Sequence, residues 1–216
     1  RDAGNVICII DYGMGNLRSA QKGFEKAGHQ AVVSDDPAVI ARADAVVLPG
    51  VGAFKDCYDG LASRGLVEPV KEAAASGRPF LGICIGLQLL FEESEENAGA
   101  KGLGIFRGRV VRFPAAADTG LKVPHMGWNR LAPVSGRPNP LLAETSAHPY
   151  TYFVHSYYAV PEDPDIVLAT CEYGVNFAAM VGRGNVYAVQ FHPEKSQTEG
   201  IAILRAFGNL AQGAAV

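Results

Sequence analysis

The sequence has no apolar run long enough to cross a membrane and no surplus of charge of one sign. Its longest apolar stretch is interrupted by Gly82, Gly86 and Gln88, whereas a spanning helix needs about 20 consecutive apolar residues. Lys and Arg together number 19 against 22 Asp and Glu, which gives a net charge of −3, and no basic stripe stands out. The sequence therefore indicates neither a membrane span nor nucleic-acid binding.

Cysteine is scarce, and its pattern excludes two common uses. The 4 cysteines are Cys8, Cys57, Cys84 and Cys171. No two of them form a C-x-x-C pair, and their spacing is not that of a disulfide scaffold. No His-Glu-x-x-His motif or Cys/His cluster is present, so we expect no metal and no cofactor. Residues 1–5 do not resemble a signal peptide, and we therefore expect reduced thiols in a cytoplasmic protein.

Length and composition suit one compact domain. The chain has 216 residues, of which 48% are hydrophobic, and this is enough to build a full core. We see no internal repeat and no linker that would divide the chain. We therefore expect a single domain over residues 1–216.

The first half of the chain alternates between strands and helices. Apolar, β-branched runs predict strands, helical spacing of apolar residues predicts helices, and Gly28 and Gly77 are expected helix ends. Strands are predicted over 6–10, 31–33, 45–48 and 80–84, and helices over 16–27, 66–76 and 87–93. This alternation predicts an α/β fold whose sheet has a parallel centre.

The second half is richer in strands, separated by Gly, Pro and Asn turns. Strands are predicted over 104–113, 152–160, 166–171, 177–181 and 186–191, followed by a closing helix over 200–210. Residues 115–120 and 135–149 are predicted loops, to which we assign no function. With little helix between these strands, we expect antiparallel additions to the parallel sheet.

The segment around Cys84 is the most informative in the chain. Cys84 lies between Gly82 and Gly86, where a predicted strand gives way to a predicted helix. Hydrolases expose a serine nucleophile with the same G-x-S-x-G spacing. The start of a helix favours a thiolate and offers the Ile85 N–H to a developing oxyanion. The alternative is a buried cysteine in a core strand, which is also common.

A nucleophilic cysteine needs a base, and the base needs an orienting group. His192 and Glu194 follow the last predicted strand, and Pro193 favours an extended conformation at His192. Residues two apart on an extended segment project to the same side, so Glu194 is expected beside His192, where it would fix the tautomer. The alternative is a histidine at a strand end followed by a solvated charge.

A second oxyanion donor is expected from the loop after another predicted strand. Gly50, Val51 and Gly52 follow residues 45–48, and loops at the carboxyl ends of parallel strands gather at one edge of the sheet. The glycines leave backbone amides accessible, although a plain tight turn would have the same composition.

Together these segments resemble the class I (triad) glutamine amidotransferases. The resemblance rests on Gly82-Ile83-Cys84-Ile85-Gly86-Leu87-Gln88 and Gln190-Phe191-His192-Pro193-Glu194-Lys195-Ser196. Residues 11–16, 124–129 and 152–157 narrow it to the glutaminase subunits of imidazole glycerol phosphate synthases. It covers nearly the whole chain and implies an open, twisted, mixed sheet with helices on both faces.

The resemblance implies that Cys84 attacks glutamine and releases glutamate and ammonia through a thioester. It also implies glutamine contacts at Gln88, Glu96 and the backbone near His155 and Ser156. Gln88 lies one helical turn beyond Cys84 and can face the same pocket, although an ordinary helix-surface amide is the alternative. Glu96 belongs to an acidic run that could instead be a solvated face.

Ammonia released for synthesis must reach an acceptor, and 216 residues leave no room for a synthase domain. The resemblance implies a separate (β/α)8 cyclase subunit, HisF, in a heterodimer. We expect it to dock near Asn16, Met126, Trp128, Asn129 and Lys195. Trp128 is the single tryptophan, and aromatic residues often anchor interfaces. A core tryptophan is the alternative.

Three other functions are compatible with parts of the sequence. Gly13-Met14-Gly15, with Asp35 or Asp36 about twenty residues on, partly matches a dinucleotide fingerprint, but Arg18 occupies the third glycine position. A glutaminase serving a different acceptor is disfavoured by residues 124–129. A catalytically silent partner is disfavoured by the intact Cys84, His192 and Glu194.

Overall fold

The structure is a computed structural model that describes residues 5–213. Residues 1–4 and 214–216 lie outside that range, so the expectation about a signal peptide falls almost entirely outside it. Within residues 5–213, no helix combines the length and the apolar character needed to span a membrane.

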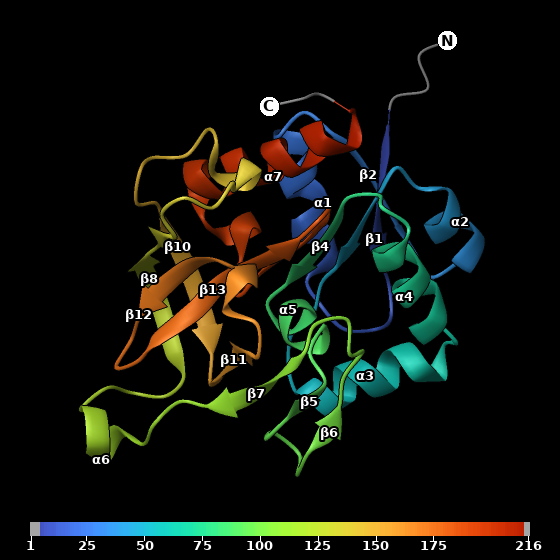
Figure 1. Cartoon of the computed structure of the whole chain (residues 1–216). Helices are drawn as coiled ribbons and strands as arrows, with labels where there is room; N and C mark the ends of the chain where they lie inside the picture. The colour runs from blue at the N-terminus through green and yellow to red at the C-terminus, as the bar shows by residue number, and fades with distance from the viewer. Residues whose placement is uncertain (1–4, 214–216) are drawn as a thin grey trace.

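The centre of the fold is an eight-stranded mixed sheet (Figure 1). In spatial order its strands are β2 (Gln30–Ser34), β1 (Val6–Ile10), β3 (Ala45–Leu48), β4 (Phe80–Ile83), β14 (Val186–Val189), β13 (Asn176–Arg183), β12 (Val167–Glu172) and β9 (Ala132–Pro133). The strands from β2 to β14 pair in parallel, and β13, β12 and β9 continue the sheet by antiparallel pairing. The predicted parallel centre with antiparallel additions is confirmed.

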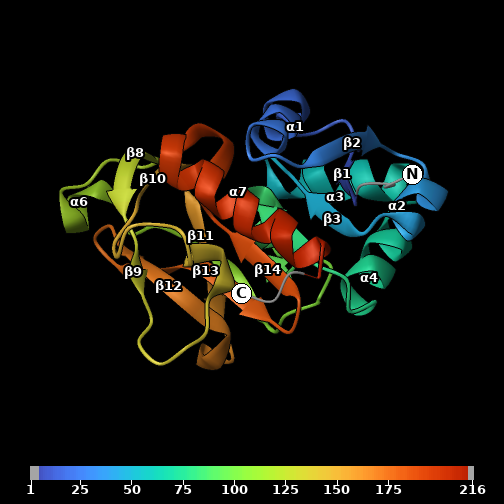
Figure 2. The same cartoon turned by 90° about the horizontal axis from the view of Figure 1, so that it is seen from above.

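Helices cover both faces of this sheet, as expected (Figure 2). They are α1 (Leu17–Lys26), α2 (Pro37–Arg42), α3 (Phe54–Ser63), α4 (Val67–Ala75), α5 (Ile85–Leu89) and α7 (Gln197–Ala211), with a short α6 (Ala116–Thr119) farther out. Helix α1 packs against α7 on one face, where Phe24 and Phe207 meet with ring centroids 6.1 Å apart. Full burial of each ring contributes about 1.5–3 kcal/mol.

The central strands are apolar along their whole length because helices cover both sides of them. All residues of β3 and β4 are buried, as are all but the first of β1. Such continuous apolar runs are typical of parallel sheets, whereas a half-exposed strand alternates. Because these strands are parallel, the loops that follow them collect at one edge, where Pro49, Cys84 and His192 lie.

Two smaller sheets form beside the antiparallel edge. One pairs β8 (His125–Arg130) with β10 (Tyr150–His155), and the other has the order β11 (Tyr157–Pro161), β7 (Gly108–Arg112), β5 (Glu93–Ser94) and β6 (Ala100–Lys101). The predicted single strand over 152–160 is wrong, because the chain breaks at Ser156 and passes from one small sheet to the other. An uninterrupted run of residues with high strand propensity does not show where a chain leaves one sheet and joins another.

Other element boundaries also differ from the prediction. Of the predicted strand over 104–113, only β7 (Gly108–Arg112) is formed. The helix predicted over 87–93 is α5, which ends at Leu89. The predicted loops over 115–120 and 135–149 contain α6 and a 3-10 turn, Pro140–Leu142. Helices α2 and α3, and strand β8, were not predicted. Helix α2 is only 6 residues long, and the apolar residues of α3 and β8 are interrupted by polar ones.

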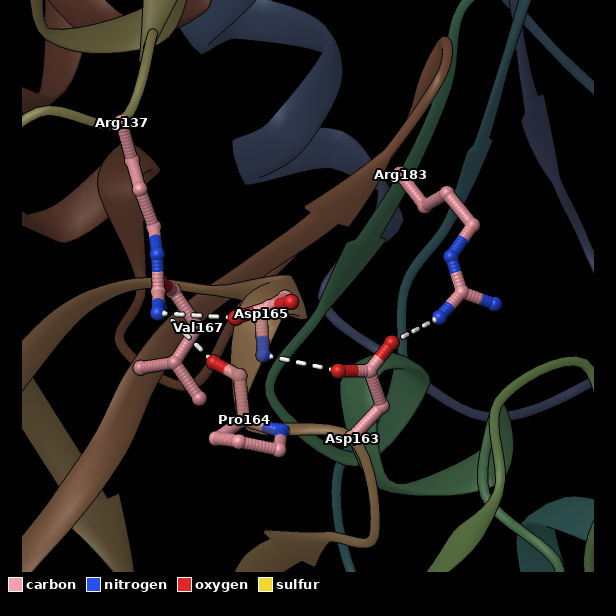
Figure 3. A network of polar contacts seen from close by, with 6 residues as sticks. All are labelled: Arg137, Asp163, Pro164, Asp165, Val167 and Arg183. Carbon is pink, nitrogen blue, oxygen red and sulfur yellow. Dashed lines mark hydrogen bonds and ion pairs between the residues drawn. The ribbon is translucent and has the colours of Figure 1, made fainter.

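Arg137 and Arg183 bind the segment 163–167, which leads into β12, as Figure 3 shows. Nη2 of Arg183 donates to Asp163 at 2.6 Å, and Nη2 of Arg137 donates to Asp165 at 3.3 Å. Arg137 also donates through Nη1 to the Val167 carbonyl at 2.6 Å. The charged partners are largely exposed, so each ion pair contributes about 0–1 kcal/mol. The network therefore mainly fixes the direction in which the chain enters β12.

Candidate active site

Cys84 occupies a sharp turn between β4 and α5. Its backbone is in a rarely populated region (φ 56, ψ −111), which costs a non-glycine residue about 1–3 kcal/mol and is typical of functional sites. A Cβ at Gly86 would lie 1.9 Å from the Leu48 carbonyl oxygen, and a Cβ at Gly82 would lie 2.8 Å from the Gly86 oxygen. Only glycine fits at both positions, so the G-x-C-x-G pattern reflects close packing around the turn.

His192 is brought to Cys84 because β14 lies beside β4. Val189 pairs with Ile83, and the Cys84 N–H donates to the Val189 carbonyl at 2.9 Å. His192 follows on extended backbone (φ −102, ψ 97), as the following proline predicts. Cys84 and His192 line the same cavity.

Glu194 contacts His192 as predicted, but the backbone between them is not extended. Nδ1 of His192 donates to Oε1 of Glu194 at 2.7 Å, and their side chains are 2% and 4% exposed. The expected extended segment is wrong, because Pro193–Lys195 form a 3-10 turn in which the Lys195 N–H donates to the His192 carbonyl at 3.1 Å. Pro193 has the φ of a first helical residue, so the pair closes across a turn.

The charge on His192 depends on both neighbours. Burial lowers the pKa of His192, but the Cys84 sulfur and the Glu194 carboxylate raise it by more, and its pKa is raised to about 10. Nε2 of His192 has no formed hydrogen bond within the described residues, although the sulfur lies close enough for their charges to interact. His192 therefore carries a positive charge beside the Cys84 sulfur at neutral pH.

A cavity of about 520 Å³ opens in front of Cys84, a size suited to a small molecule. Its lining residues are Asn16, Val51, Gly52, Cys84, Ile85, Gln88, Glu96, Pro124, Val154, His155, Ser156, Tyr157, His192 and Lys195. The structure thus gathers the sequence-predicted site residues around one space, apart from Gly50, Met126, Trp128, Asn129 and Glu194, which stand outside the lining.

The residues expected to contact substrate differ in whether their polar groups already have hydrogen-bond partners in the protein. Nε2 of Gln88 donates to the Tyr157 carbonyl at 3.1 Å, while the buried Oε1 of Gln88 has no partner in the described chain. Glu96 accepts the Phe54 N–H at 3.1 Å, so it is tied to the cavity wall rather than to a solvated face. His155 and Ser156 lie where β10 ends, beside the cavity.

The first predicted oxyanion donor, the Ile85 N–H, already donates a hydrogen bond within the protein. The Ile85 N–H donates to the Gly50 carbonyl at 3.2 Å. The carbonyls on either side are also held, since Tyr12 donates its hydroxyl to Pro49 and the Cys57 thiol donates to Val51 at 3.3 Å. An oxyanion can use the Ile85 N–H only after the Gly50 carbonyl has turned away.

The remaining cysteines are chemically different from Cys84. Cys8, Cys57 and Cys171 are fully buried. Burial raises the pKa of Cys8 and Cys57 to about 11 and that of Cys171 to about 12. These thiols stay protonated and weakly nucleophilic at neutral pH. Within residues 5–213, no cluster of acidic, Cys and His side chains could hold a metal ion.

The residues expected at a partner interface fall into two groups. Met126 and Trp128 project from one face of β8 and are 62% and 48% exposed, so the alternative of a core tryptophan is wrong. Asn129 turns to the other face, where its Nδ2 donates to the Glu172 carbonyl at 2.9 Å. Asn16 and Lys195 are exposed at the mouth of the cavity.

Two buried histidines, of which His155 lines the cavity, form a directed hydrogen-bond chain that the sequence did not predict. Nδ1 of His155 faces the Tyr157 carbonyl at 2.8 Å, and Nε2 faces Nδ1 of His125 at 2.9 Å. The carbonyl can only accept, so His155 donates there and accepts from His125. Nε2 of His125 accepts from Asn129 at 3.2 Å. Neutral rings satisfy every one of these bonds.

This neutral pair predicts a loss of stability in mild acid. Burial lowers the pKa of His125 to about 4 and that of His155 to about 3, from 6.5. Below about pH 6.5 the unfolded chain binds protons that the folded chain excludes, so the free energy of unfolding falls as pH decreases toward 4. We expect a loss of about 1 kcal/mol per histidine between roughly pH 6.5 and 5.5.

Urea unfolding at the two pH values measures this loss. The pKa of His192 is shifted in the opposite direction, so His192 gains a little stability as its unfolded form takes up the last part of its proton over this window, which partly offsets the loss. The His125→Gln variant should show a smaller difference between the two pH values than the unaltered chain. An equal difference in both proteins would contradict a neutral His125.

A cysteine in a strand-to-helix turn, facing a histidine braced by glutamate at the edge of an open α/β sheet, is the arrangement of a thiol-dependent acyl-transfer enzyme. The family model of the class I glutamine amidotransferases matches residues 8–209. The chain belongs to this family, as the resemblance predicted.

The more specific resemblance also has support among relatives. The chain is 59% identical to "Imidazole glycerol phosphate synthase subunit HisH" of Syntrophotalea carbinolica, over 95% of this chain and 100% of that protein. It is 53% identical to the subunit of the same name from Geobacter sulfurreducens, over 94% and 98% of the two chains.

Solved structures support the fold. "Structure of PurLQS from Thermotoga maritima" has a TM-score of 0.73 at 21% sequence identity and covers 96% of this chain and 99% of that chain. The crystal structure of another glutamine amidotransferase has a TM-score of 0.72 at 20% identity, covering 95% of this chain and 98% of that chain. At these identities the likeness concerns the fold alone.

Proposed function

We propose that this chain is the glutaminase subunit of an imidazole glycerol phosphate synthase, acting in histidine biosynthesis as a single domain in the cytoplasm. The observation that carries this proposal is Cys84, which is held on strained backbone and lines the same cavity as His192. Relatives named HisH support the choice of pathway. The alternative of a dinucleotide-binding module has no comparable support.

The chemistry follows from the contacts of Cys84 and His192. The Cys84 thiolate attacks the side-chain amide carbon of glutamine, and the carbonyl π electrons move onto oxygen. When the tetrahedral intermediate collapses, the C–N bond breaks and the proton on Nε2 of His192 goes to the departing nitrogen, which leaves as ammonia. A glutamyl thioester on Cys84 remains.

Hydrolysis of the thioester restores the enzyme. Neutral His192 takes a proton from water, whose oxygen attacks the thioester carbon, and collapse expels the Cys84 thiolate together with glutamate. Glu194 keeps Nδ1 of His192 protonated and directs Nε2 at the sulfur throughout, and it stabilises the imidazolium. No step requires a cofactor or a metal.

Substrate orientation uses groups that line the cavity. The unpaired Oε1 of Gln88 is a buried acceptor for an N–H of glutamine, and leaving it unpaired is costly. Glu96 supplies a negative charge suited to the α-ammonium group, and the backbone near His155 and Ser156 completes the site. Ile85 and an N–H from residues 50–52 receive the oxyanion once the Gly50 carbonyl has turned.

Release of glutamate from glutamine tests this function. The chain should produce glutamate when mixed with a cyclase subunit from the same organism and the nucleotide ligand of that cyclase. No glutamate above the uncatalysed background, with folded protein and all components present, would overturn the proposal.

The partner in this proposal is a (β/α)8 cyclase subunit, HisF, in a heterodimer. Ammonia passed to it directly avoids conversion to ammonium, and the cyclase then makes imidazole glycerol phosphate and an aminoimidazole carboxamide ribotide. The exposed Met126 and Trp128 lie on the same part of the molecule as Lys195, whose Nζ sits 6.0 Å from the Tyr152 ring. Trp128 in turn packs edge-on against Tyr152.

Fluorescence of the single tryptophan reports on this contact. We expect the emission of Trp128 to move to shorter wavelength when a tryptophan-free form of the cyclase is added, because docking removes water from an indole that is 48% exposed in the free chain. An unchanged spectrum across a saturating titration would remove Trp128 from the interface. A Met126→Ala variant, which keeps the reporter, should bind more weakly.

A further inference from the structure

Gln190 is a buried polar residue to which the proposed mechanism gives no role. It is 0% exposed and lies two residues before His192, in the bend that follows β14. Its Nε2 lies 3.9 Å from the Cys84 sulfur, and its Oε1 lies 3.1 Å from Nε2 of Gln88. Gln190 therefore joins the nucleophile to a residue of the substrate cavity.

The hydrogen bonds fix which end of each amide points where. The Tyr157 carbonyl can only accept, so the end of Gln88 that faces it at 3.1 Å is the NH₂ group. The second N–H of that group points to Gln190, which must present its oxygen. The NH₂ group of Gln190 is thereby directed at Cys84, and Oε1 of Gln88 is left without a partner in the described chain.

We propose that Gln190 is a further residue of the reaction with two roles: its NH₂ group stabilises the Cys84 thiolate, and its oxygen holds Gln88 with Oε1 turned to the substrate. This inference rests on the proposed function, in which Cys84 is the nucleophile. Unlike His192, the amide carries no proton that the reaction consumes. It therefore still donates to sulfur when neutral His192 has activated water and the thiolate departs.

Three substitutions separate the two roles. Gln190→Met has similar length and loses both contacts. Gln190→Glu keeps an oxygen toward Gln88 but places an acceptor beside the sulfur. In Gln190→Asn the amide is retained, but the shorter side chain no longer reaches Cys84 or Gln88. The matched control is Gln21→Met, which removes another side-chain hydrogen bond, from Gln21 to the Ala31 carbonyl at 3.0 Å, away from the site.

The primary readout is the rate of Cys84 alkylation by iodoacetamide as a function of pH, with labelled peptides mapped by mass. We expect the midpoint of the profile to move upward by about one pH unit or more in Gln190→Met and Gln190→Glu, as for loss of a hydrogen bond to a charged group. The control should keep the midpoint of the unaltered chain. In complex with the cyclase, Gln190→Met should also raise KM for glutamine roughly tenfold.

A merely structural role would lower the thermal midpoint but leave the alkylation profile of the folded fraction in place, and that result would overturn the proposal. Either neutral variant that folds, Gln190→Met or Gln190→Asn, decides the question, because each removes the donor from sulfur without adding a charge. Failure of the proposed function looks different, since glutamate release would then persist in Cys84→Ala whatever occupies position 190.

Discussion

Replacing Cys84 by alanine is expected to abolish glutamine-dependent synthesis by the complex while leaving ammonia-dependent synthesis by the cyclase intact. Loss of the nucleophile from a triad removes on the order of 10⁶ of the rate, which places the variant at background. The cyclase uses ammonia from solution without Cys84, so its own chemistry is unaffected. Product formation with glutamine and with an ammonium salt at high pH, measured on the same preparation, gives both rates.

Cys171→Ala is the matched control for this experiment. Cys171 is fully buried on β12 and is absent from the cavity lining, so its loss should leave both rates near those of the unaltered chain. Cys57 is a poorer control because its thiol contacts the Val51 carbonyl. Glutamine-dependent synthesis that survives in Cys84→Ala would assign the nucleophile elsewhere.

The second large effect concerns the oxyanion donors. We expect the isolated chain to hydrolyse glutamine slowly and the cyclase with its nucleotide ligand to accelerate it by about 10²–10³, the contribution of one oxyanion donor. The reason is the 3.2 Å hydrogen bond from Ile85 to the Gly50 carbonyl, which occupies the N–H that the intermediate needs. Acceleration then requires that the peptide after Gly50 rotate.

Alkylation of Cys84 provides the control, because attack on iodoacetamide creates no oxyanion. The thiolate is already supported by His192 and Glu194, so addition of the partner should leave the alkylation rate similar or lower it by shielding. Full glutamine turnover by the isolated chain would contradict a blocked donor. Hydrolysis and alkylation that rise together would indicate that the partner activates the sulfur instead.

The central parallel strands of the fold could be predicted closely from the sequence. The strands over 6–10 and 45–48 match β1 and β3 residue for residue, because a strand buried on both faces is a continuous apolar run bounded by polar loops. Strand partners in the second half could not be predicted in this way. Tyr152 and Val160 belong to different sheets, and only long-range packing of the small sheets decides where the chain breaks.

The residues of the site were predictable where chemistry fixes their spacing. Cys84 between two glycines and His192 two residues before Glu194 are local patterns, and their meeting follows from the parallel pairing of β4 with β14. The orientation of the Gly50 carbonyl was not predictable, because residue identity leaves a glycine peptide free to face either way. Gln190 was not predicted, because its place beside Cys84 depends on the bend that follows β14.

In the proposed mechanism, Cys84 is the residue to which the glutamyl group becomes attached. The most direct measurement is the mass of the Cys84 peptide after the complex has been quenched in acid during turnover of glutamine. We expect a glutamyl group on this peptide, and none on the matching peptide of Cys84→Ala. A glutamyl group on Cys8, Cys57 or Cys171, or sustained glutamate release by the alanine variant, would contradict it.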